Sequence, residues 1–192
     1  DAHTAVARLL FALEGDAVAQ RHLADACARF PHHIPLHELW VEWIRDEPPE
    51  VREPIVRRLI DVGADNAWAH RELGFLLASQ QRYEEAWKEC EIAGRLEPTS
   101  PPQYLLRARL LRAADRLDEA KQELRAALES SIDNDNALAA WMELCESLAE
   151  RRAVLEFFQE QLEKQVIFGD GLLAFREHAA NTLEPQELLQ RL

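Results

Sequence analysis

The stretch HRELGFLLASQQRYEEAWKECEIAGRLEP, from His70 to Pro98, decides the fold of this chain. Apolar residues recur three and four positions apart on both sides of a short polar turn, which predicts two amphipathic helices over 67–79 and 83–95. Gly74 lies in the middle of the first helix, where glycine costs about 1 kcal/mol relative to alanine. Gly74 therefore needs a packing reason.

The same periodicity runs through all 192 residues, and no strand pattern accompanies it. The chain is therefore predicted to be all-α. No long linker divides it, so we expect one continuous array over 1–192. The expected helices cover residues 3–13, 17–29, 35–46, 53–62, 67–79, 83–95, 101–113, 117–130, 135–149, 151–165, 171–182 and 185–192.

A period of 34 residues relates the central helix pair to its neighbours. Adding 34 to Leu77 and Ala86, for example, gives Leu111 and Ala120, which are again apolar or small. Helix pairs at a fixed period predict a solenoid, and an irregular helical bundle is the alternative. The expected units are 1–32, 33–66, 67–100, 101–134, 135–168 and a partial unit 169–192.

The central unit resembles the tetratricopeptide repeat, whose pattern is W-x2-L-G-x2-Y, then A-x3-F, then P. The resemblance implies a right-handed α-solenoid of antiparallel helix pairs. It also implies that Gly74 lies at a close crossing of the paired helices, where the small Ala86 leaves room. Leu73, Gly74, Ala86 and Pro98 match the pattern, while His70, Leu77 and Cys90 replace its Trp, Tyr and Phe.

Composition and charge exclude several classes of function. The net charge of -13 argues against a nucleic-acid surface, which needs a strongly basic face. No apolar run reaches the length of a membrane span, about 18 residues, and no secretory signal segment is visible, so no membrane partner is expected. Cys27, Cys90 and Cys145 are far apart in sequence, which is typical of reduced, buried thiols and favours a cytoplasmic location.

No cluster of residues predicts catalysis or a cofactor. His32, His33 and His37 resemble a metal cluster, but Pro35 lies between them and delays the start of a helix that would align them. The run 133–136 resembles the opening of a calcium loop, yet it lacks the Gly and Glu that such a loop needs. A helix N-cap explains this run better. We therefore expect no metal, no cofactor and no enzyme activity within these residues.

The first helix of each pair has a second face beside its packing face, because residues three, four and seven apart share one side of a helix. In the tetratricopeptide family this face lines a concave groove. The alternative is that its apolar members bury against the neighbouring repeat. The candidate peptide-binding residues are Trp68, Arg71, Phe75, Leu105, Arg109 and Arg112, and the fourth unit places Asn136, Ala139, Ala140 and Glu143 on the equivalent face.

These features predict a non-catalytic protein–protein interaction scaffold that binds a peptide segment of a partner in the groove. Arginine and tryptophan often dominate binding energy, and the candidate cations would complement an acidic peptide with apolar anchors. The lysine-based carboxylate clamp of chaperone-binding relatives is absent, because the fourth unit offers Asn136 without a lysine. The alternative is a substrate-recruiting arm of a larger enzyme, such as a glycosyltransferase that carries such repeats.

Both ends of the chain carry apolar stripes without a polar capping helix. We therefore expect the 192 residues to be a segment of a longer chain, whose ends either fray in isolation or form a homo-oligomer. The stripes are Val6, Leu9, Leu10 and Leu13 at one end and Leu188, Leu189 and Leu192 at the other.

Overall fold

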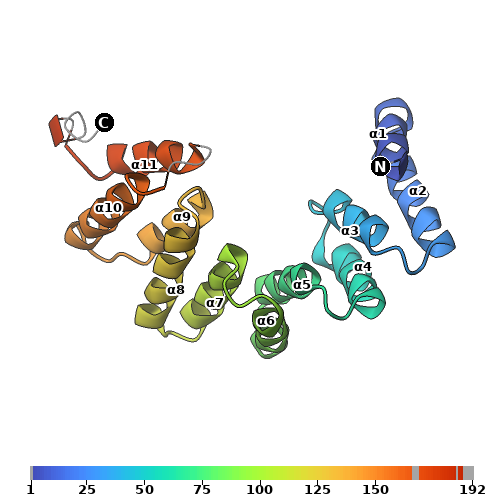
Figure 1. Ribbon diagram of the computed structural model, residues 1–192, viewed down its shortest axis with the longest axis horizontal. Helices are drawn as coiled ribbons and strands as arrows, with labels where there is room; N and C mark the ends of the chain where they lie inside the picture. Colours follow the sequence, from blue (N-terminus) through green and yellow to red (C-terminus); the bar gives the residue numbers. More distant parts are fainter. Residues whose placement is uncertain (1, 166–168, 185, 188–192) are drawn as a thin grey trace. The chain divides into compact units, whose positions relative to one another are not determined.

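The computed structural model describes residues 2–165, 169–184 and 186–187, and all the regular structure in these ranges is α-helical (Figure 1). The all-α prediction is therefore confirmed. The helices are α1 (Ala2–Glu14), α2 (Asp16–Arg29), α3 (Ile34–Trp43), α4 (Pro49–Val62), α5 (Ala67–Ser79), α6 (Tyr83–Leu96), α7 (Pro101–Ala113), α8 (Leu117–Ser130), α9 (Asp135–Glu143), α10 (Leu148–Leu162) and α11 (Asp170–Ala180).

The helices form two compact units, Asp1–Leu96 and Glu97–Leu192. In the first unit, α1 packs on α2, α3 on α4, and α5 on α6, and α2–α3 and α4–α5 contacts join the pairs. In the second unit, α7 packs on α8, α8 contacts α9, and α11 packs on both α9 and α10. A single array that continues across the boundary between the units stays a prediction.

The central pair buries the residues that the repeat pattern assigns to its core. Leu73 and Leu77 of α5 and Ala86 of α6 are almost completely inaccessible to solvent. Gly74 is buried as well, in the helix that packs directly on α6. The buried side of each helix therefore follows the apolar spacing of the sequence, as amphipathic helices require.

The sequence-based boundaries are wrong at the α9–α10 connection. The prediction of helices over 135–149 and 151–165 placed the break at the wrong residues, because α9 ends at Glu143 and α10 begins at Leu148. The physical reason is a helix cap: the hydroxyl of Ser147 accepts a hydrogen bond from the backbone N–H of Glu150 at 3.1 Å. Ser147 and Glu150 form the S-x-x-E pattern that marks a helix start.

Other boundaries also differ from the prediction: α10 ends at Leu162 instead of residue 165, and α11 ends at Ala180 instead of residue 182. Helix α4 begins at Pro49 instead of residue 53, because proline is well suited to the first helical position, where its missing N–H costs nothing. Helix α3 ends at Trp43 rather than at residue 46. Most of the expected helix over 185–192, including Leu188, Leu189 and Leu192, lies outside the described residues.

Polar residues that resembled metal ligands serve as helix caps. The ring of His33 accepts a hydrogen bond from the N–H of Leu36 and caps α3. The side chain of Asn134 accepts from the N–H of Ala137 at 3.2 Å and caps α9, which confirms the N-cap interpretation of the run 133–136.

His37 makes the stability of the first unit dependent on pH. Its side chain is completely buried, and burial, reinforced by the positive charge of Arg58, lowers its pKa below the usual 6.5. Below pH 6.5 the unfolded chain takes up a proton that the folded chain resists, so stability falls as pH falls from about 7 towards 5. Urea unfolding at several pH values should show this loss, and His37→Gln should remove it. An identical pH slope in both proteins would contradict the assignment.

The three cysteines are free and buried, as their positions in the sequence predict. Burial raises the pKa of the Cys27 thiol to about 11. The thiolate that would react is therefore scarce at neutral pH.

The apolar stripe predicted at the N-terminus lies partly in solvent. Leu9 is 58% exposed and Leu13 is 71% exposed. Pairing with another copy through this stripe stays a prediction. None of the described helices has both the length and the apolar character needed to span a membrane.

Candidate functional site

Helix α5 carries three of the predicted groove residues on successive turns. Trp68 and Phe75 are half-buried. Arg71 is only 6% exposed, so a ligand on the surface would meet little of its side chain. These three residues lie in the first unit, and their role in peptide binding stays a prediction.

Helix α7 carries the other three predicted residues, in the second unit. Leu105 is half-buried, whereas Arg109 and Arg112 are exposed. Arg112 donates a hydrogen bond from Nη1 to Oε2 of Glu143 on α9 at 2.7 Å, so part of its charge is already neutralised. The structure thus groups the six predicted residues into a set on α5 and a set on α7. That the two sets line one groove stays a prediction.

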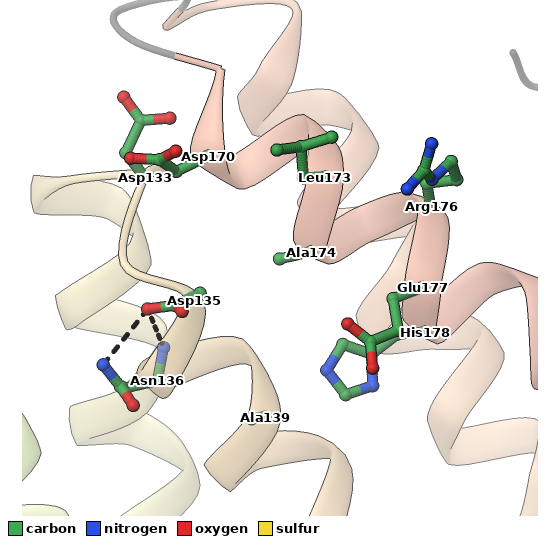
Figure 2. Close-up of a pocket in the computed structure, with 10 residues that line it drawn as sticks. All are labelled: Asp133, Asp135, Asn136, Ala139, Asp170, Leu173, Ala174, Arg176, Glu177 and His178. Atoms are coloured by element: carbon green, nitrogen blue, oxygen red, sulfur yellow. Dashed lines mark hydrogen bonds between the residues drawn. The ribbon is translucent and has the colours of Figure 1, made fainter.

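A cavity of about 490 Å³ lies within the second unit between α9 and α11 (Figure 2). Asn136 and Ala139 line it from α9, and Leu173 and Ala174 line it from α11. In the predicted repeat units, α9 and α11 are the first helices of successive repeats, so the prediction places the cavity between two equivalent faces. Its volume falls in the range of about 300–1,000 Å³ that is typical of ligand sites.

Carboxylates dominate the charge of this cavity. Asp133 contributes from the α8–α9 loop, Asp135 from the start of α9, and Asp170 and Glu177 from α11. Arg176 is the only arginine or lysine among the described lining residues, and its guanidinium points away from α9 (Figure 2). The ring of His178 and the carboxylate of Glu177 instead point towards α9. The cavity therefore presents a negative surface to a ligand.

Specific contacts hold the two walls in place. The N–H of Gly171, at the start of α11, donates to Oδ1 of Asp133 at 3.0 Å. On the other side of α11, the rings of Phe175 and Phe158 are buried and stack with their centroids 6.1 Å apart. Since α11 is anchored to both the α8–α9 loop and α10, the lining residues of α11 are preorganised.

A second cavity, of about 340 Å³, lies between α8, α9 and α10. The guanidinium of Arg125 lies 4.7 Å from the centroid of the Phe157 ring, and Lys121 forms an ion pair with Glu150 at 3.3 Å. Burial raises the pKa of the Cys145 thiol in its wall, which argues against a nucleophilic role. The charges of this cavity are thus largely paired within the chain, unlike those between α9 and α11.

Sequence reasoning missed the α11 wall of the first cavity, although a signal was present. The signal is the 34-residue period, which carries the four α9 positions predicted for the groove face onto α11. The residues reached from Asn136, Ala139, Ala140 and Glu143 are Asp170, Leu173, Ala174 and Glu177, and all four line the cavity.

Comparisons with known proteins support the repeat fold. No protein-family model and no curated protein sequence matches this chain. Among solved structures, PilF of Pseudomonas aeruginosa has a TM-score of 0.67 and 16% identity, covering 100% of this chain and 87% of PilF. A tetratricopeptide repeat protein from Parabacteroides merdae has a TM-score of 0.66 and 12% identity, and the match covers 98% of this chain and 73% of that protein.

A third similar structure is YrrB, described as a TPR protein with an unusual peptide-binding site. Its TM-score is 0.56 at 14% identity, with 88% of each chain covered. At such identities the likeness concerns the fold. The fold is that of tetratricopeptide repeat proteins, an α-solenoid of antiparallel helix pairs, so both the predicted resemblance and the predicted fold class are confirmed.

Proposed function

We propose that this chain is a non-catalytic interaction scaffold whose first repeat helices bind a peptide segment of a partner protein. The observation that carries the proposal is the cavity between α9 and α11, two helices that the predicted repeat units make equivalent. The similarity in fold to YrrB, which is described as having a peptide-binding site, supports the same class of ligand. The proposal includes a cytoplasmic location, because the three cysteines are free and buried and the cytoplasm keeps thiols reduced.

The candidate contacts outside the cavity are Trp68, Arg71 and Phe75 on α5 and Leu105, Arg109 and Arg112 on α7. Arg109 and Arg112 are the most accessible cations of this set, so they are the proposed contacts for acidic residues of the partner. The half-buried aromatic side chains on α5 are the proposed apolar anchors.

Reversing the charge of the two α7 arginines tests the proposal. The native partner would be captured from the source extract, mapped to a peptide and titrated by fluorescence anisotropy. Arg109→Glu combined with Arg112→Glu is expected to weaken binding by about tenfold or more, because both changes replace attraction by repulsion. Circular dichroism should show unchanged helicity, since both side chains are exposed.

Arg151→Glu combined with Lys164→Glu provides the matched control. Both residues are exposed in the second unit, in or just after α10, and the double change alters the net charge by the same amount. This control should bind as the unmodified protein does. Equal loss in both double variants, or persistent binding by the α7 variant, would refute the α7 surface.

A further inference from the structure

We infer that the cavity between α9 and α11 binds a Lys or Arg side chain of a partner peptide, with an apolar residue of the same peptide against Leu173. This inference rests on the proposed function and names the chemistry of one subsite. It differs from the sequence-based expectation of an acidic peptide with apolar anchors, because the sign of the charge changes between α7 and the helices α9 and α11. Exposed arginines lie on α7, and carboxylates lie on α9 and α11.

Three of the four carboxylates that line the cavity are available to a ligand. Among the described residues, Asp135, Asp170 and Glu177 make no ion pair within 4 Å, whereas Glu143, 34 residues before Glu177, is paired with Arg112. Asp135 accepts hydrogen bonds from the backbone and side chain of Asn136, and neither of these donors carries a positive charge. A cationic ligand would provide the charge that this part of the chain does not supply.

The spacing of these groups suits an organic cation better than a metal ion. In the ranges that the structure describes, no three His, Cys, Asp or Glu side chains converge closely enough to hold a metal. A guanidinium carries five N–H donors and an ammonium three, so one side chain could reach carboxylates on both walls. An acidic cavity would repel phosphate groups, which argues against a nucleic acid or an anionic lipid surface as the ligand.

The cavity also offers apolar contact for the rest of such a ligand. Leu173 is 56% exposed at its wall, and Ala139 and Ala174 lie beside it. Lysine and arginine side chains pack their aliphatic stems on apolar surface while the charged end stays with polar partners. An exposed leucine bordered by carboxylates therefore matches a basic residue followed by an apolar one.

Nuclear magnetic resonance titration of the 192-residue chain with acetyl-Arg-Leu-Arg-amide tests the inference. We expect the largest backbone shifts at Ala139, Leu173, Ala174 and Glu177, and we expect acetyl-Glu-Leu-Glu-amide to cause none there. Raising sodium chloride from 50 to 500 mM should weaken the binding, because salt screens the attraction between exposed charges. Shifts confined to other residues, or equal binding of the acidic tripeptide, would overturn the inference.

A matched pair of double variants makes the test specific. Asp135→Asn combined with Glu177→Gln keeps the shape of both side chains and removes two cavity charges, and it should weaken binding of the basic tripeptide about fivefold or more. Glu160→Gln combined with Glu163→Gln removes two exposed charges outside the cavity lining and should leave binding unchanged. Equal affinities of the two double variants would refute the inference.

The same reagents separate this inference from the proposed function. If the partner peptide depends on Arg109 and Arg112 but the cavity variant binds normally, the scaffold function stands and the cavity assignment is wrong. If neither the α7 variant nor the cavity variant affects the partner peptide, both proposals fail.

Discussion

Replacing Phe158 by alanine is expected to lower the free energy of unfolding by about 3–5 kcal/mol, the range observed for removal of a buried aromatic side chain. Phe158 is completely buried in α10 and stacks on Phe175 of α11 with an angle of 5° between the ring planes. The change would leave a cavity where α11 docks. Urea unfolding followed by circular dichroism measures the loss.

The neighbouring residue provides the control for this prediction. Phe157 is half-buried and contacts Trp141, with ring centroids 5.4 Å apart, so Phe157→Ala removes less buried area. It should cost clearly less stability than Phe158→Ala. Equal losses for the two variants would contradict the assignment of Phe158 to the core of the second unit.

Substituting Gly171 by alanine is the second change with a large expected effect. A Cβ atom at this position would lie 2.6 Å from the carbonyl oxygen of Ile132 and 3.1 Å from its carbonyl carbon. Because both are backbone atoms, either α11 or the α8–α9 loop has to move. We expect a loss of about 1–3 kcal/mol, as for other overpacked sites, and a weaker response of the cavity to the basic tripeptide.

Gly63 offers a matched comparison in the first unit. A Cβ atom there would lie 2.9 Å from Cδ1 of Ile34, the end of a flexible side chain that can turn away. Thermal unfolding should therefore show a smaller loss for Gly63→Ala than for Gly171→Ala. The reverse order would show that the contact of Gly171 with the Ile132 backbone does not restrain α11.

The paired helices follow from the sequence because their cause is local. The 3.6-residue period places Leu73 and Leu77 on the same side of α5 and places Ala86 on the packing side of α6. This placement depends only on the sequence within each helix. The 34-residue period then repeats this arrangement along the chain. Helix ends were harder to predict, because apolar spacing alone does not mark them. The cap at Ser147 interrupts a pattern that remains periodic on both sides.

The α7 and α9 residues of the candidate surfaces could also be predicted from helix periodicity, because the period determines which side chains share a face of a helix. Periodicity does not determine how far each side chain is exposed. Arg71 and Arg109 were both placed on the predicted groove face, yet Arg71 is buried and Arg109 is exposed. Burial depends on the neighbouring elements, and their contacts are not encoded by the spacing within one helix.

The spacing of apolar residues along the chain was enough to predict paired amphipathic helices, and the resemblance of the central unit to the tetratricopeptide pattern predicted their type. The acidic cavity required the folded structure. Asp135 and Glu177 are far apart in sequence and meet at one cavity only because α11 packs on α9 and α10 at a particular crossing. That crossing depends on the stacking of Phe158 with Phe175 and on the close approach of Gly171 to Ile132. Such contacts join residues of different helices, so their geometry is a property of the packed unit and not of any segment within it.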